Sequence, residues 1–116
     1  MKKFILALTL ATVASSVQAD LSIDAFKQLS SGKKLEKTTV EMYVGGVVKG
    51  YLNANAFLSA SNQPQMFCFS GDIDTGTAHR LASESIKEHL AKSPNDGKRE
   101  IVEFLLLNKL RTLYPC

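Results

Sequence analysis

Two cysteines constrain the fold of this chain more than any other residues. Cys68 lies near the middle of the sequence, and Cys116 is its last residue, in the stretch Tyr-Pro-Cys. Two cysteines allow a single intramolecular pairing, and such pairs oxidise in exported proteins. The sequence therefore predicts a Cys68–Cys116 disulfide that holds the C-terminal segment against the middle of the chain. Closing this loop should contribute roughly 4 kcal/mol to stability on the chain-entropy model.

The first nineteen residues have the pattern of a secretory signal peptide. Lys2 and Lys3 supply positive charge, residues 4–14 form an apolar stretch, and residues 17–19 (Val-Gln-Ala) resemble a cleavage site. The apolar stretch is shorter than the roughly 20 residues that a membrane helix needs. We therefore expect a cleaved signal peptide at 1–19, a mature domain at 20–116 in the periplasm, and no membrane insertion after cleavage.

The charge of the mature chain argues against nucleic acid as a partner. The full sequence has 14 Lys and Arg against 11 Asp and Glu, and loss of Lys2 and Lys3 leaves 12 basic side chains. Binding to phosphate groups requires a concentrated basic face, which a nearly neutral chain of this length does not readily offer. We expect one small domain that binds no nucleic acid.

Apolar residues recur at helical spacing in four segments, and no segment alternates with period two for long enough to form a strand. We expect an all-α fold, a small four-helix bundle with one disulfide. The last helix is apolar on most sides, so we place it at the centre of the bundle; an apolar face turned toward a partner is the alternative. The four expected helices cover residues 20–29, 35–59, 74–92 and 98–113.

The longest expected helix, 35–59, contains three glycines. Each glycine inside a helix costs about 1 kcal/mol relative to alanine, so a compensating gain is expected. Gly46 and Gly50 lie one turn apart, and we expect them to form a notch where a neighbouring helix approaches closely. A helix broken near Gly45 and Gly46 is the alternative. The apolar stripe of this helix is expected at Val40, Val44, Val47, Tyr51, Ala54 and Leu58.

No pattern of catalytic or metal-ligating residues stands out in the sequence. His79 and His89 are ten residues apart on one expected helix, so they point in different directions and cannot hold one metal ion together. Cysteines in a disulfide are neither nucleophiles nor metal ligands. We therefore expect a binding protein with no cofactor and no catalytic activity. His89 is expected to be a partly buried packing residue, with a catalytic or pH-sensing role as the alternative.

Several short motifs resemble the Rap/Tai family, which are small exported immunity proteins of type VI secretion systems. The resemblance covers residues 42–116, and the Tyr-Pro-Cys ending is its most distinctive part. The chain departs from the family pattern in two ways: Asp74 and His89 stand where the family prefers a threonine and an aromatic residue, and a further cysteine of many members is missing. The motifs are Tyr43-Val44-Gly45-Gly46-Val47, Phe67-Cys68, Ile73-Asp74, His89-Leu90, Ser93-Pro94 and Leu113-Tyr114-Pro115-Cys116.

The resemblance implies a periplasmic immunity-type protein that binds and neutralises a cell-wall-degrading, amidase-like effector. Such a protein would be a small rigid helical body that presents a loop or a helix face to the cleft of the effector. The alternative is a periplasmic acid-stress chaperone, which would expose apolar helix faces around residues 104–107 when carboxylates are protonated. The sequence leaves open which effector is bound and whether the chain forms a homodimer. The expected partner-binding residues are Ser61, Asn62, Gln63, Gln65, Ser70 and Asp72.

Overall fold

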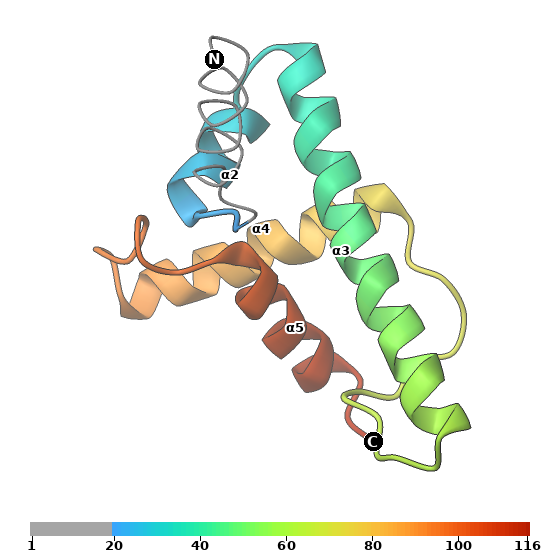
Figure 1. Ribbon diagram of the computed structural model, residues 1–116. Helices are drawn as coiled ribbons and strands as arrows, with labels where there is room; N and C mark the ends of the chain where they lie inside the picture. The colour runs from blue at the N-terminus through green and yellow to red at the C-terminus, as the bar shows by residue number, and fades with distance from the viewer. Residues whose placement is uncertain (1–19) are drawn as a thin grey trace, which may run out of the picture.

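The computed structural model describes residues 20–116, and four helices make up most of this part of the chain (Figure 1). Among these residues, the only strand-like pairing is an isolated antiparallel bridge between Ser22 and Ile101. The predicted all-α fold of four helices is therefore confirmed, whereas the predicted signal peptide, 1–19, lies outside the described residues. The helices are α2 (Ile23–Ser30), α3 (Lys34–Ala60), α4 (Thr75–Lys92) and α5 (Val102–Leu113).

Capping side chains explain where α2 and α4 begin. The Ser22 hydroxyl accepts a hydrogen bond from the backbone N–H three residues later at 3.1 Å, and Asp74 Oδ1 accepts one from the Thr77 N–H at 2.7 Å. These bonds satisfy donors that the first turn of a helix otherwise leaves unpaired. The same Thr77 N–H lowers the pKa of Asp74 below its ordinary value. α4 ends at Lys92, directly before the Ser-Pro pair that predicts its end.

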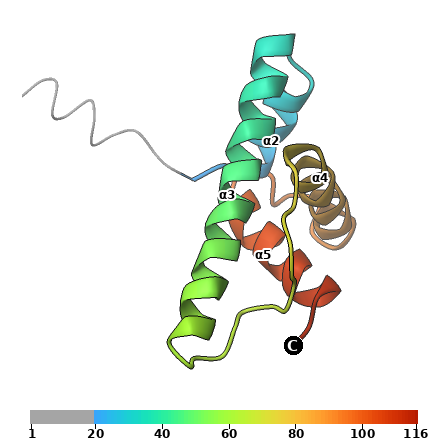
Figure 2. The ribbon, with the colours of Figure 1, turned by 90° about the vertical axis from the view of Figure 1, so that its right-hand side faces the viewer.

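α3 is the helix against which the other three pack (Figures 1 and 2). With 27 residues it is about 40 Å long at 1.5 Å per residue, so it offers room to α2, α4 and α5 along its length. The prediction that the last helix lies at the centre is wrong. α5 has only 12 residues and packs mainly on α3 and α4, and its Phe104 is 59% exposed.

The apolar core lies where these helices meet. The face of α3 that enters it agrees only in part with the predicted one: Val40 and Val44 are buried as predicted. Val48 is fully buried, whereas Val47 is half-buried and Ala54 is exposed. The reason is that α3 packs on two sides. Tyr51 turns toward α5, where its hydroxyl donates to the Glu103 carbonyl oxygen at 2.8 Å. The buried apolar residues are Ile23, Phe26, Val40, Val44, Val48, Phe67, Ile73, Ala78, Leu81, Ala82, Ile86, Val102, Leu106 and Leu110.

α3 runs unbroken through its three glycines, so the alternative of a helix broken near Gly45 and Gly46 is wrong. The predicted notch is also wrong: a Cβ added at Gly46 or Gly50 would meet no heavy atom within 4 Å. The close approach is at Gly45, where a Cβ would lie 2.6 Å from Thr75 Cγ2 and 3.2 Å from Thr75 Cβ. Adjacent helical residues point about 100° apart, so the glycine that meets α4 is a neighbour of the one predicted.

The predicted disulfide is present between Cys68 and Cys116, whose Cα atoms are 4.8 Å apart. It joins the segment that follows α5 to the irregular segment between α3 and α4. The Cys68 N–H also donates to the Tyr114 carbonyl oxygen at 2.7 Å, so a hydrogen bond reinforces the link. The disulfide is consistent with an oxidising compartment. Within residues 20–116, no helix has the length and hydropathy that crossing a membrane requires.

Candidate partner-binding surface

One buried side chain anchors the irregular segment between α3 and α4, residues 61–74. Asn55 is 4% exposed; its Nδ2 donates to the Phe67 carbonyl oxygen and its Oδ1 accepts from the Met66 N–H, both at 2.8 Å. An amide carries both donors and acceptors, so one side chain satisfies two backbone groups of the segment. The sequence analysis missed this residue. Asn55 follows Val48 by seven residues and therefore lies on the same face of the helix. This spacing could have predicted its burial.

Below this anchor, the last turn of α3, the following segment and the C-terminal residues form one end of the molecule (Figures 1 and 2). We call residues 57–69 and 113–116 the disulfide end. Within it, the rings of Phe69 and Tyr114 lie with centroids 4.7 Å apart, and the disulfide joins the two parts. Two large apolar side chains remain open to solvent, Phe57 at 71% and Leu113 at 44%.

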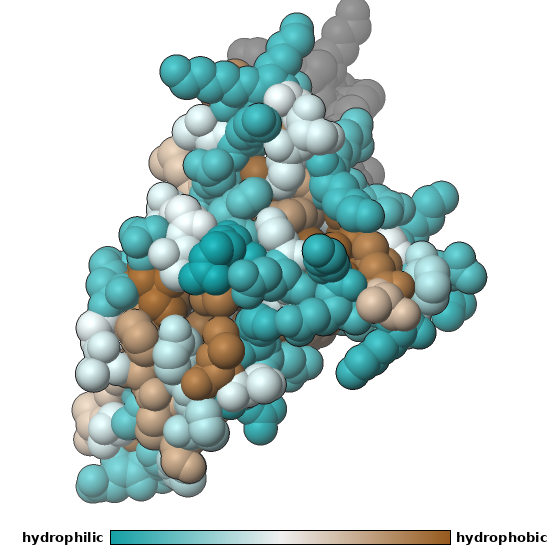
Figure 3. All heavy atoms as spheres, turned by 180° about the vertical axis from the view of Figure 1, so that it is seen from behind, coloured by the Kyte–Doolittle hydropathy of each residue, from teal (hydrophilic) through white to brown (hydrophobic). Residues whose placement is uncertain are grey.

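The disulfide end carries no charged side chain. None occurs anywhere between Lys49 and Asp72. Figure 3 shows this end, at its lower left, as a mixture of brown, white and teal spheres, while teal dominates much of the rest of the face. The cores of protein–protein interfaces are depleted of charged residues and enriched in aromatic ones. In these two respects, the composition of the disulfide end resembles that of an interface core. The sequence analysis missed this, although the uncharged run can be read directly from the sequence.

Four of the six predicted partner-binding residues belong to the disulfide end. Ser61, Asn62 and Gln63 are exposed and form the turn after α3, whereas Gln65 is half-buried. Asn62 has a φ of 56°, in the left-handed region that asparagine tolerates better than most residues. The Gln63 N–H donates to the Leu58 carbonyl oxygen at 2.8 Å, which ties the turn to the end of the helix.

The remaining two residues lie farther along the same segment. Both Ser70 and Asp72 are exposed, and Asp72 Oδ2 lies 3.7 Å from Lys49 Nζ. Lys49 precedes Ser61 by twelve residues, so this pair lies about 18 Å along α3 from the turn at Ser61. The structure therefore places the predicted residues in two separate groups, and the group at the turn belongs to the disulfide end.

Two surface hollows lie outside the disulfide end. One, of about 720 Å³, lies between α2 and α4, and the other, of about 250 Å³, lies between α4 and α5. No residue of the disulfide end lines either hollow. Small-molecule sites are usually concave, whereas protein partners bind broad surfaces. These two hollows are therefore separate from the disulfide end.

Both histidines also lie outside the disulfide end. His79 Nε2 is 3.0 Å from the Ser30 hydroxyl, and its ring stacks on Phe26. His89 is half-buried, as predicted, but its Nε2 faces the carboxylates of Asp96 and Glu100. The sequence analysis treated His89 as a packing residue, because both carboxylates follow the end of the helix and only the fold brings them back to it.

Comparisons of the chain with protein-family models, with curated proteins and with solved structures found no match. The likeness to the Rap/Tai family therefore rests on the short motifs alone.

Proposed function

We propose that the mature chain, residues 20–116, is a periplasmic immunity-type protein that binds and neutralises a cell-wall-degrading, amidase-like effector of a type VI secretion system. The disulfide end would contact the effector. The observation that carries the proposal is the surface of this end, which has no charged side chain, exposes Phe57 and is held in place by the disulfide.

A surface fixed before binding favours tight association. Each side chain or loop that becomes ordered on binding reduces the affinity, and this cost falls when the binding conformation already exists. At the disulfide end, the Cys68–Cys116 bond and the two hydrogen bonds of Asn55 already hold the backbone. An interface of ordinary size, about 800 Å² on each partner, can then reach nanomolar affinity.

The test is protection of bacteria from the effector. An amidase encoded beside this protein, directed to the periplasm, should kill cells that lack the protein and spare cells that export it. Deletion of residues 1–19 should abolish protection, because the two proteins would then lie on opposite sides of the membrane. Equal protection by the cytoplasmic form would contradict the proposal.

Two matched variants locate the contact. Phe57 and Leu35 are both exposed residues of α3, at 71% and 78%, but they lie at opposite ends of the helix. Phe57→Lys places a charge within the disulfide end and should weaken binding to the amidase at least tenfold, as loss of an aromatic residue central to an interface does. Leu35→Lys should leave the affinity unchanged. Equal effects of the two substitutions would exclude the disulfide end as the contact.

The exposed Phe104 on α5 favours a second candidate, the periplasmic acid-stress chaperone. Such a protein would prevent aggregation of unfolded periplasmic proteins at low pH through apolar surface. Purified protein that suppresses aggregation at low pH, loses this activity in Phe104→Ser, and gives no protection from the amidase would favour the chaperone over the immunity protein.

A further inference from the structure

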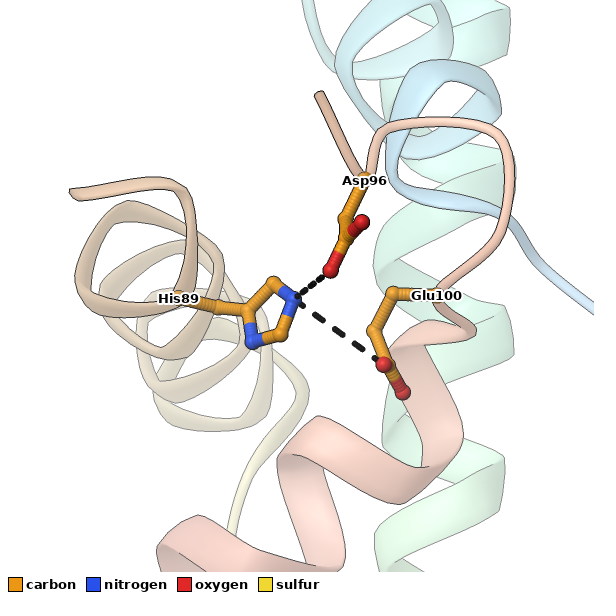
Figure 4. A group of neighbouring side chains, drawn as sticks. All are labelled: His89, Asp96 and Glu100. Carbon is orange, nitrogen blue, oxygen red and sulfur yellow. Dashed lines mark hydrogen bonds and ion pairs between the residues drawn. The ribbon is translucent and has the colours of Figure 1, made fainter. Parts of the chain in front are cut away.

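Three side chains with metal-ligating atoms converge where α4 meets the segment leading to α5. His89 lies in the last turn of α4, and Asp96 and Glu100 lie one turn apart in the connecting segment. Figure 4 shows both carboxylates pointing toward the same edge of the imidazole ring. His89 Nε2 is 3.0 Å from Asp96 Oδ2 and 3.9 Å from Glu100 Oε2, and the three ligand atoms all lie within 4.8 Å of one another.

We propose that His89, Asp96 and Glu100 form a binding site for a divalent transition-metal ion, with Zn²⁺ as the ion of choice. Zinc binds imidazole nitrogen and carboxylate oxygen at about 2.0–2.2 Å, so two ligand atoms in tetrahedral positions lie about 3.4 Å apart. The two distances from His89 Nε2, 3.0 and 3.9 Å, fall on either side of this value. The two carboxylate oxygens lie within 4.8 Å of each other, so they would have to approach by up to about 1.4 Å, with smaller shifts at His89, to complete the geometry with water as the fourth ligand.

The charge of the cluster independently favours a cation. The side chains of Asp96 and Glu100 are only 33% and 31% exposed, and both face the same imidazole. Among residues 20–116, no lysine or arginine nitrogen lies within 4.0 Å of either carboxylate. Two half-buried carboxylates side by side repel each other, and a divalent ion would balance both charges at once.

The backbone holds the ligands in place without the ion. The Glu100 N–H donates to the Asp96 carbonyl oxygen at 3.0 Å, which keeps the two carboxylates on one face of a helical turn. The N–H groups of Asp24 and Ile23 bind the carbonyl oxygens of Gly97 and Glu100, so the segment is also fixed to α2. The ligand set suits Zn²⁺ or Mn²⁺ rather than Ca²⁺, which takes six to eight oxygen ligands.

The chain allows a clean test, because it has two histidines and both cysteines are in the disulfide. The experiment titrates ZnCl₂ into the exported, metal-stripped protein without a histidine tag, by calorimetry and by NMR of the two imidazole rings. We expect one ion per chain and changes in the resonances of His89 but not of His79. Added Zn²⁺ should also raise the melting temperature, as any ligand of the native state does.

Three substitutions separate the site from other acidic groups. Asp96→Asn and Glu100→Gln each remove one charged ligand at constant size, and each should weaken Zn²⁺ binding at least about tenfold. Glu88→Gln is the matched control, because Glu88 lies beside His89 in the sequence but pairs with Lys109 at 2.6 Å instead. Thermal unfolding in the presence of a chelator confirms that each variant folds. Two results would overturn the proposal: no binding at millimolar Zn²⁺, or binding that Asp96→Asn and Glu100→Gln leave unchanged.

Discussion

The disulfide end and the rest of the domain are stabilised by different interactions. The helical head is formed by α2, α4, α5 up to residue 112 and α3 up to residue 56. In it, apolar side chains from several helices are buried against one another; Ile23, Ile86 and Leu106 are each at most 3% exposed. In the disulfide end, Phe67 is the one residue buried to this degree. There, the disulfide and hydrogen bonds from Asn55 and Cys68 hold the backbone in place, whereas helix packing holds it in the head.

The two regions differ because their backbone N–H and C=O groups find hydrogen-bond partners in different ways. A helix satisfies most of its own N–H and C=O groups, so packing it requires only an apolar face. An irregular segment must find other partners for every buried backbone group. For residues 61–74, the Asn55 amide and the C-terminal segment supply partners of this kind. The surface that results is held by the disulfide and by specific hydrogen bonds, and Phe67 is its one fully buried residue. Four predictions test this contrast, from the largest expected effect to the smallest.

Removal of the disulfide should have the largest effect. The double variant Cys68→Ser with Cys116→Ser should lose about 2–5 kcal/mol of unfolding free energy, the usual range for a small secreted domain. Denaturant unfolding followed by circular dichroism measures the loss, and wild-type protein under reductant is the control. Hydrogen exchange should show loss of protection first at residues 66–69. A loss below about 1 kcal/mol would mean that the head stabilises the disulfide end unaided.

Loss of the Asn55 anchor should have the second-largest effect on stability. Asn55→Ala leaves the Phe67 carbonyl and the Met66 N–H without their partner, and each unpaired buried group costs about 1–3 kcal/mol. Because water can reach part of this segment once it loosens, we expect a total of about 2 kcal/mol. Asn53→Ala, at an exposed position of the same helix, should change stability by less than about 0.5 kcal/mol. Equal effects of the two substitutions would show that the anchor is unimportant.

The helical head was more predictable from the sequence than the disulfide end. Ser22 and Asp74 are capping residues whose local chemistry marks a helix start, and two cysteines leave one intramolecular pairing. The role of Asn55 and the convergence of Asp96 on His89 depend on how distant segments meet, which periodicity does not encode. The face of α3 was partly mispredicted for the same reason: which glycine or valine points inward depends on where α2, α4 and α5 cross it.

Two glycines of α3 should give smaller changes in unfolding free energy, of opposite sign, within the head. Gly45→Ala would press a Cβ against Thr75 Cβ, 3.2 Å away, which rotation of the threonine side chain cannot relieve. Overpacking costs about 1–3 kcal/mol, whereas the gain in helix propensity is at most about 1 kcal/mol, so we expect a net loss near 1 kcal/mol. Gly50→Ala meets nothing within 4 Å and should gain up to about 1 kcal/mol. Thermal or denaturant unfolding of both variants measures the difference, and a stabilising Gly45→Ala would exclude tight packing of α4 on α3.

The smallest expected effect lies on the contact between α3 and α5. The Tyr51 hydroxyl donates to the Glu103 carbonyl oxygen at 2.8 Å, so Tyr51→Phe should cost about 1 kcal/mol at neutral pH. Burial, and after it the charge of Glu103, raise the pKa of Tyr51 above its ordinary value of 10.0. The folded state therefore favours the neutral phenol.

The pH dependence of this contact follows from the direction of that shift. Below pH 10.0, the phenol is neutral in both folded and unfolded chains, and its contribution to stability is complete. As the pH rises through the raised pKa, the unfolded chain loses the proton first, and the contribution disappears. Denaturant unfolding of wild type and Tyr51→Phe, at neutral pH and at about pH 11, should therefore show a smaller difference between the two proteins at the higher pH. Tyr43, whose pKa is also raised by burial and by Glu103, keeps its own alkaline dependence in both proteins. A difference that stays constant with pH would mean that the Tyr51 hydroxyl does not lie in the contact between α3 and α5.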